Sequence, residues 1–354
     1  MFAGSGVLGS NLAHKDDKMS AIKQSRPLIW SLLIILATAG SNLDLTAAGP
    51  LTLRFGHYAN DDHSVGKTAR QFVAILNETT GGRLRVDLYP GSKLGSAKSM
   101  FNATQEGSLD ITLAPPIYLR DIAPKMDIVG LPFLFKNYED VNRIFRPGEP
   151  VNEQLLEDLQ RGNIKGLAFW EVGFRHISTS RRQIRTPWDL KGLRIRTISD
   201  QVLFQTFSLL GASPVSMPYG ELFSVLQRGA IDAQEGSIDT FYQSKLFETQ
   251  RYLSLTRHSY TALVLVMNLS KFKSLSGRDQ EYVVNAAQRA ADWGRNYSRN
   301  LEEQNIRELE KMGLNIERNP DWYGFRKMVF YELQEKFVRE DGRNLLREIE
   351  RRLR

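Results

Sequence analysis

The 354-residue sequence contains no cysteine, which excludes disulfide bonds and any mechanism that needs a thiolate. Its five histidines include no pair spaced four residues apart and no H-E-x-x-H pattern, so their spacing does not indicate a metal site. The sequence has no G-x-S-x-G, no P-loop pattern, and no G-x-G-x-x-G that opens a helix after a strand. Adjacent acids such as Glu302 and Glu303 are typical of a solvated surface. Nothing in these patterns argues for an enzyme or predicts a cofactor.

Long apolar runs are scarce as well. The run from Leu28 to Leu36 is far shorter than the roughly 20 residues of a membrane-spanning helix. Basic residues precede it and small residues follow it, which is the pattern of a cleaved secretory signal. We therefore predict that residues 1–48 form a signal peptide and leader and that the mature protein is exported. An uncleaved N-terminal anchor is the alternative, and Met19 is a second candidate for the true start.

The overall composition is that of a soluble globular protein. Hydrophobic residues make up 42% and charged residues 25%, and the length is sufficient for two domains. The net charge of +7 suits an anionic partner, but the basic residues are spread along the chain from Arg54 to Arg354. Charge alone therefore predicts no basic arm of the kind that binds nucleic acid.

Strand patterns alternate with helix patterns over most of the chain, which predicts an α/β fold with parallel sheets flanked by helices. The expected strands are 51–58, 83–90, 109–115, 164–170, 193–198, 214–218 and 230–236. The expected helices are 64–82, 96–107, 201–210 and 220–228. Two such groups, divided near residue 172, indicate two lobes.

The last part of the chain has a different pattern. Ser276, with Asp279 three residues later, is typical of a helix N-terminus. Apolar residues then recur at helical spacing from Val283 to Leu301. We expect one long amphipathic helix that packs across both lobes.

The stretch GFRHISTSRRQIRTPWDLKGLRIRT, residues 173–197, holds seven basic residues and one acid. Nucleic-acid readers combine such charge with exposed aromatic residues or a recognition helix, and neither pattern is present, so we predict no nucleic-acid partner. Arg181, Arg182 and Arg185 fall in a polar loop, where solvated charge is the simpler interpretation.

Two arginines of this stretch differ from the others. Arg196 falls at the end of the strand GLRIRT, and Arg175 follows the strand 164–170 by a few residues. Ligands of α/β sheets bind beyond the carboxyl ends of strands, and a guanidinium offers a planar fork that matches a carboxylate. Arg175 and Arg196 are therefore candidate ligands of a small anion.

At this point the sequence resembles a known family, the solute-binding subunits of tripartite ATP-independent periplasmic (TRAP) transporters of the dicarboxylate type. The resemblance covers residues 51 to about 340 and depends on the order and spacing of motifs that are weak one by one. In chain order the motifs are FGHYANDDHSVGKTARQF, TGGRLRVDLYPGSKLGS, GSLDITLAP, LPFLF, the basic stretch, LGASPVSMPYGELFSVLQRGAIDAQEG and the long helix after LSGRDQ.

The resemblance implies a two-lobed periplasmic-binding-protein-like fold with crossing segments and a long C-terminal helix. We expect lobe I to contain residues 51–172 and about 262–300, and lobe II to contain residues 173–261 and about 301–354. The ligand is expected in the cleft between the lobes.

The resemblance also assigns roles to single residues. It implies that Arg196 pairs with the ligand carboxylate, that Arg175 is a second positive group beside it, and that Tyr219 is an aromatic residue of the pocket. The predicted site further includes Tyr58 of the first motif and Glu235 of the A-Q-E-G turn.

Four positions in or near the predicted site depart from the family pattern or add to it. Gly236 stands where many members carry an asparagine that helps to fix the carboxylate. Pro115 and its neighbour Pro116 stand where some sugar-acid binders carry polar residues. Asp200 adds an acid near the pocket, either as an acceptor for a ligand hydroxyl or amine or as a solvated helix start.

The leading interpretation is a periplasmic protein that captures a small organic acid and delivers it to the membrane subunits of a TRAP transporter, without a cofactor or metal. C4-dicarboxylates, 2-oxo acids, aromatic acids and sugar acids all fit this prediction. A ligand sensor that reports to a receptor is the first alternative, and a secreted enzyme on the same scaffold is the second. The membrane is expected to be contacted only through the transporter.

Overall fold

The computed structural model describes residues 50–217 and 219–354, and the predicted leader lies outside this part of the chain. Its strands are β1 (Leu51–Gly56), β2 (Leu84–Tyr89), β3 (Ile111–Ala114), β4 (Ile164–Thr179), β5 (Arg194–Thr197), β6 (Ser213–Ser216), β7 (Ala233–Gly236), β8 (Tyr252–Asn268) and β9 (Asn315–Glu317). Its helices are α1 (Ser64–Thr80), α2 (Ala97–Glu106), α3 (Pro116–Leu119), α4 (Tyr138–Phe145), α5 (Pro150–Asp158), α6 (Gln201–Leu209), α7 (Leu222–Gln227), α8 (Ile238–Gln243), α9 (Leu269–Ser274), α10 (Gly277–Lys311), α11 (Trp322–Phe337) and α12 (Glu340–Leu353). Short 3-10 turns include η1 (Pro124–Ile128) and η4 (Tyr219–Glu221).

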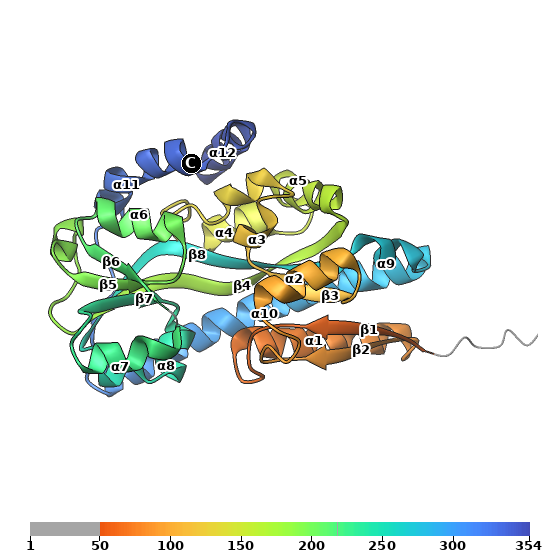
Figure 1. The fold of residues 1–354 in the computed structure, drawn as a ribbon, viewed down its shortest axis with the longest axis horizontal. Coiled ribbons are helices and arrows are strands. Elements are labelled where there is room, and N and C mark those ends of the chain that lie inside the picture. Colours follow the sequence, from red (N-terminus) through yellow and green to blue (C-terminus); the bar gives the residue numbers. More distant parts are fainter. Residues whose placement is uncertain (1–49, 218) are drawn as a thin grey trace, which may run out of the picture. The chain divides into compact units, whose positions relative to one another are not determined.

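Two long antiparallel strands, β4 and β8, form the centre of the sheet (Figure 1). Both are buried along almost their whole length, and both are rich in β-branched and aromatic residues that suit a strand covered on two faces. The strand order is β2-β1-β3-β8-β4-β7-β5-β6, with β9 paired to β8.

The outer strands divide the sheet into two halves. The β1 half consists of β1, β2 and β3, and β3 pairs antiparallel with the last part of β8. The β6 half consists of β5, β6 and β7, and β7 pairs antiparallel with the last part of β4. The strands within each half are parallel, as the strand-helix alternation predicts, but the two contacts with the centre are antiparallel.

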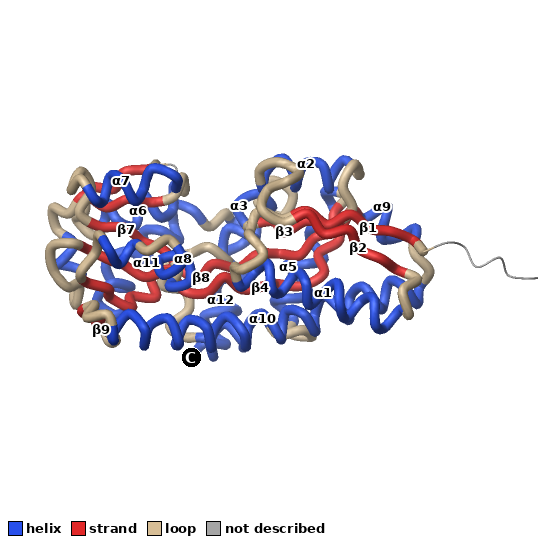
Figure 2. Tube along the Cα trace, turned by 90° about the horizontal axis from the view of Figure 1, so that it is seen from below, coloured by secondary structure: helices blue, strands red, loops and turns tan. Residues whose placement is uncertain are grey.

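Helix α10 runs along both halves (Figure 2). Its first turn is capped by the Ser276 hydroxyl, which accepts a hydrogen bond from the backbone N–H of Asp279 at 3.1 Å. Its apolar stripe packs on α1 and β4, and its later part packs on α8. The predicted capping residue and the predicted long helix are both confirmed, and with them the α/β fold crossed by one long helix.

The C-terminal helices α11 and α12 lie on the opposite face from α10. Helix α11 packs on α6, and α12 packs on α4 and η1. The core beneath them joins Phe330 and Leu333 of α11 to residues of β4 and α6 such as Phe174 and Phe207. The division into lobes near residues 172, 262 and 300 stays a prediction. Helix α12 was assigned to lobe II, but it contacts α4 and η1, which were assigned to lobe I.

Several predictions about elements were wrong. The strand expected at 164–170 continues to Thr179, because β8 offers it a partner over its full length. Arg175 therefore lies inside β4 and not beyond its end. The elements that were not predicted are strands β8 and β9 and helices α3, α4, α5, α8, α9, α11 and α12.

A bulge bends β4 where it passes between the two halves. The register with β8 shifts between Glu171 and Gly173, and Gly173 has a φ of 112°. A Cβ atom at Gly173 would lie 3.0 Å from the Tyr138 hydroxyl and 3.3 Å from Glu302 Oε2. Glycine is thus required at this position both for its backbone conformation and for its lack of a side chain.

Replacing Gly173 with Ala is expected to lower the free energy of unfolding by about 1–3 kcal/mol, because the new methyl group adds a close contact to an unfavourable φ. Gly148 is a matched control, since its φ is 84° and nothing lies within 4 Å of its Cβ position. The Gly148→Ala variant should lose at most about 1 kcal/mol. Urea denaturation of both variants measures the difference, and equal losses would show that the contact at Gly173 relaxes freely.

Candidate functional site

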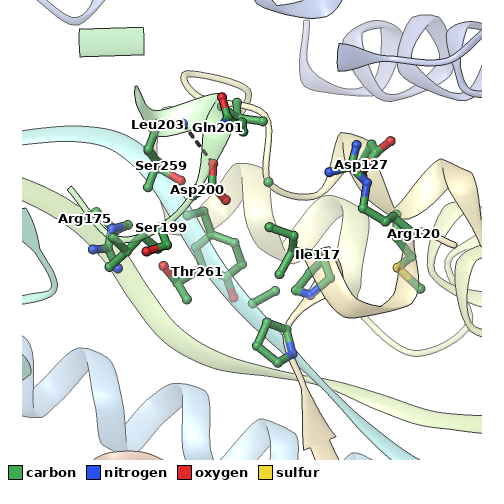
Figure 3. Close-up of a pocket in the computed structure, with 18 residues that line it drawn as sticks. Ile117, Arg120, Asp127, Arg175, Ser199, Asp200, Gln201, Leu203, Ser259 and Thr261 are labelled. Atoms are coloured by element: carbon green, nitrogen blue, oxygen red, sulfur yellow. Dashed lines mark hydrogen bonds and ion pairs between the residues drawn. The ribbon is translucent and has the colours of Figure 1, made fainter. Parts of the chain in front are cut away.

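A cavity of about 210 Å³ opens beside the centre of the sheet (Figure 3). It is lined by the segment after β3, by Arg175 of β4, by residues 198–203 after β5, and by residues 259–262 of β8. Both β3 and β5 end at this cavity, so it lies beyond the carboxyl ends of strands from the two halves of the sheet. Its volume is below the roughly 300–1,000 Å³ of pockets for drug-sized ligands and suits a small metabolite.

Arg175 belongs to a buried charged group. Its Nη2 donates to Glu235 Oε1 at 2.8 Å and its Nε donates to Glu235 Oε2, while the imidazole Nε2 of His258 lies 3.3 Å from the same Oε2. The side chains of Glu235 and His258 are fully buried, and that of Arg175 is 12% exposed. Glu235 is not among the residues that line the cavity, and its two oxygens fix the orientation of the guanidinium.

The pKa values of this group follow from burial and pairing. Burial alone would raise the pKa of Glu235, but Arg175 and His258 hold it well below its usual range. Burial lowers the pKa of Arg175, whereas Glu235 and then Asp200 raise it, and the net shift is upward. Burial also lowers the pKa of His258, against the pull of Glu235. Arg175 is therefore a permanent cation, and Glu235 a permanent anion, at every physiological pH.

Asp200 lies at the turn between β5 and α6. Its Oδ1 accepts a hydrogen bond from the backbone N–H of Leu203 at 2.9 Å and so caps α6, as the second of the two interpretations of this residue predicts. Asp200 also lines the cavity, as Figure 3 shows, so a helix cap and a ligand contact are compatible at this position.

Arg120 and Asp127 line the other side of the cavity, away from Arg175 and Ser199 in Figure 3. The Nε of Arg120 lies 3.1 Å from Asp127 Oδ1. Burial raises the pKa of Asp127, an effect that Arg120 and Arg339 oppose. This ion pair was not predicted from the sequence, because no motif marks either residue.

Arg196 lies in β5 and is 4% exposed. Its Nε and Nη2 donate to the backbone carbonyl of Met217 at 3.2 and 3.0 Å. It is close to the end of β5 as predicted, but it is not among the residues that line the cavity, so its contact with a ligand stays a prediction.

The other predicted site residues are dispersed. Pro115 lines the cavity, where it precedes α3. Gly236 ends β7 opposite His176 of β4 and does not line the cavity. Tyr58 is also outside the lining, although burial raises its pKa to about 12 and the charge of Arg175 opposes that shift. Tyr219 begins η4, and its side chain lies outside the described residues.

A second buried group lies under the cavity wall. The hydroxyl of Tyr260, a lining residue, donates to Glu171 Oε2 at 3.0 Å, and Arg299 of α10 donates to both oxygens of Glu171 at 2.9 and 2.7 Å. The Arg299 guanidinium lies 4.3 Å from the ring centre of Tyr138, whose hydroxyl donates to Glu302 Oε2 at 2.5 Å. These contacts connect the cavity wall to the long helix.

On sequence alone, the adjacent acids Glu302 and Glu303 are interpreted as a solvated surface, and for Glu302 this interpretation is wrong. Burial raises its pKa to about 7, and the charge of Glu171 adds to the shift, while the Tyr138 hydrogen bond and Arg299 oppose it. Glu302 therefore titrates near neutral pH, whereas Glu303 is exposed.

The basic loop charges are on the surface, as predicted. Arg181 pairs with Asp232 at 2.6 Å, and Arg185 pairs with Glu317 at 3.1 Å. Arg182 donates to the backbone carbonyls of the turn at 189–191. None of the three lines the cavity.

Neither a metal site nor a membrane span is found in the described residues. Over 50–217 and 219–354, no group of three or more His, Asp or Glu side chains is placed to hold a metal ion. No helix in the same residues is both long enough and apolar enough to cross a bilayer.

Comparisons with known proteins agree on one family. The model of the family described as bacterial extracellular solute-binding protein, family 7, matches residues 55–340. The 2,3-diketo-L-gulonate-binding periplasmic protein YiaO of Escherichia coli K12 is 31% identical over 327 residues, which cover 92% of this chain and 98% of that protein.

Solved structures of TRAP periplasmic solute-binding proteins have the same fold. One from Ochrobactrum anthropi, with its C-terminus bound in its ligand-binding pocket, superposes with a TM-score of 0.82 at 28% identity and covers 86% of this chain and 95% of its own. One from Polaromonas, bound to D-erythronate, superposes with a TM-score of 0.75 at 31% identity and covers 84% of this chain and 98% of its own.

Proposed function

Because the chain belongs to family 7 of the bacterial extracellular solute-binding proteins, we propose that it captures a small organic acid in the cavity beside Arg175. The proteins of this family bind solutes and are not enzymes. We further propose that residues 1–48 direct export to the periplasm and that the loaded protein delivers its acid to the membrane subunits of a TRAP transporter.

The observation that carries the proposal is the placement of Arg175. It is a cation at the wall of a small cavity, and Glu235, which does not line the cavity, accepts hydrogen bonds from its Nε and Nη2. Its Nη1 makes no hydrogen bond within the described residues. A ligand carboxylate that binds there gains a charge-assisted hydrogen bond, which contributes roughly 1.5–3 kcal/mol.

The rest of the cavity suits a small, partly apolar molecule. Pro115, Pro116 and Ile117 form an apolar wall, and hydroxyl groups of Ser259 and Thr261 line the wall of β8. Relatives with known ligands fit this picture, since the Escherichia coli relative binds 2,3-diketo-L-gulonate and the Polaromonas relative was solved with D-erythronate. Both ligands are small hydroxylated acids.

A thermal-shift screen of the purified protein against small organic acids tests the proposal. An acid present at 100 times its dissociation constant should stabilise the native state by about 2.7 kcal/mol. The Arg196→Ala variant should lose the shift if Arg196 pairs with the carboxylate as its motif predicts. Arg182→Ala is the matched control and should keep it, because Arg182 lies outside the cavity. A screen in which no acid at millimolar concentration shifts the melting temperature would overturn the proposed function.

A further inference from the structure

Three carboxylates stand at or directly behind the cavity wall, and they differ in their partners. Glu235 is paired with Arg175, and Asp127 is paired with Arg120. Asp200 has no cationic partner within ion-pair distance among the described residues. Asp200 is therefore a charged oxygen acceptor at the cavity that the protein itself does not neutralise.

The two oxygens of Asp200 have different surroundings. Oδ1 is used by the helix cap, through its bond to the N–H of Leu203 at 2.9 Å. Oδ2 accepts no hydrogen bond from any described residue. The cap also holds the side chain in place, so the position of Oδ2 at the cavity is set before a ligand binds.

Asp200 and Arg175 share one electrostatic environment. After Glu235, Asp200 is the next charge that raises the pKa of Arg175. Both residues also line the same cavity, on the side away from Arg120 and Asp127 in Figure 3, so a ligand carboxylate held by Arg175 lies near Asp200. The same ligand gains a hydrogen bond if it carries a donor beside that carboxylate, and it is repelled if it carries a second carboxylate there.

The neutral groups around Asp200 favour a hydroxyl as that donor. The hydroxyls of Ser259 and Thr261 and the amide of Gln201 line the cavity and make no hydrogen bond within the described residues. Each of them can both donate to and accept from a ligand hydroxyl, whereas an ammonium group can use only their acceptor oxygens.

We propose that Asp200 determines the specificity of the site, accepting a hydrogen bond from a hydroxyl of the bound acid through Oδ2. The site thereby takes hydroxylated monocarboxylates in preference to dicarboxylates and to unsubstituted fatty acids. This inference rests on the proposed function, since it concerns the same cavity and the same class of ligand.

A matched series of four-carbon acids tests the inference by titration calorimetry. D-Erythronate carries three hydroxyls, butyrate carries none, and succinate carries a second carboxylate. Threonine carries an ammonium in place of the C2 hydroxyl, keeps the C3 hydroxyl and lacks the C4 hydroxyl. In the wild-type protein, erythronate should bind at least about tenfold more tightly than each of the other three. One hydrogen bond to a charged acceptor contributes a factor of about 10 to 100 in affinity.

The variant Asp200→Asn separates a ligand contact from a structural role. Asparagine caps helices as well as aspartate does, so α6 should stay intact. The variant should bind erythronate about 10- to 100-fold more weakly, and its preference for erythronate over succinate should shrink by at least the same factor. Asp321→Asn is the control, because Asp321 caps α11 through the N–H of Gly324 and does not line the cavity. It should leave all four affinities unchanged.

The outcomes of these experiments test the proposed function and the role of Asp200 separately. Failure of the wild-type protein to bind any acid in the screen or the series would count against the proposed function. Binding of acids with the same preferences in wild type and Asp200→Asn would leave the function standing and overturn the role of Asp200. Tighter binding of threonine than of erythronate would show that Asp200 recognises an ammonium group and would overturn the hydroxyl assignment.

Discussion

Replacing Arg175 with Met is expected to abolish the ligand-induced thermal shift and to lower the free energy of unfolding by about 3–5 kcal/mol. Methionine keeps much of the side-chain volume, so the loss reports the guanidinium and not a cavity. The reason is the fully buried Glu235, which would lose its two charge-assisted contacts and keep only the neighbouring His258. A buried carboxylate without a cation is far less stable than a paired one.

The double variant Arg175→Met with Glu235→Gln tests this explanation. It removes the buried charge together with its partner, so stability should recover in part, while ligand binding should stay absent. Urea denaturation and the thermal shift together give the comparison. A double variant as unstable as the single one would show that the unpaired charge of Glu235 is not the cause.

The pH dependence of the pair has a definite sign. In the wild type the pKa of Glu235 in the folded state lies below its ordinary value of 4.5. The ionised pair of Arg175 and Glu235 therefore contributes its full stabilisation of the folded state above pH 4.5, and this contribution is lost as the pH falls below that value. Without Arg175 the pKa values of Glu235 and His258 should both rise. The deficit of Arg175→Met relative to wild type should therefore be largest at neutral pH and should shrink on acidification.

Replacing Glu302 with Gln is expected to stabilise the protein by about 2–3 kcal/mol at pH 8 and by much less at pH 5. The folded pKa of Glu302 is about 7, against an ordinary value of 4.5. Between these values the folded state holds a proton that the unfolded state has released, so wild-type stability falls as the pH rises through this range. Glutamine carries no charge and can still accept the hydrogen bond from the Tyr138 hydroxyl.

The measurement is the free energy of unfolding of wild type and variant at several pH values between 5 and 8. Glu303→Gln is the matched control, since Glu303 is the adjacent and exposed acid. It should change stability by less than about 0.5 kcal/mol at any pH. If Glu302→Gln kept the wild-type pH dependence, some other group would be responsible for it.

Local signals in the sequence predicted much of the fold. The Ser276 cap, the helix expected at 64–82 and the strand expected at 83–90 depend on residues within a few positions of each other, and the structure has them as the start of α10, as α1 and as β2. The order of the motifs likewise predicted the family, which the match over residues 55–340 confirms. Helix caps, strand patterns and motifs can be predicted because each is encoded by residues that are close together in the sequence.

Features that depend on distant partners were not predictable in the same way. Strand β8 is almost uniformly buried, so it shows no alternation for a sequence reading to detect. Arg175 was recognised as a candidate, but its pairing with Glu235 follows from the register between β4 and β7. Arg120 and Asp127 line the cavity because α3 and η1 pack beside it. No residue pattern in the sequence predicts this packing.

The pairing of β3 with β8 has a consequence for the order in which the protein is made. Residues Ile111 to Ala114 pair with β1 on one side but find their second partner only at Val264 to Met267, and α1 finds α10 later still. The first 250 residues to leave the ribosome therefore lack the strand and the helix against which their own sheet closes. The N-terminal part of the chain therefore cannot complete its sheet and its helix packing until β8 and α10 have been made.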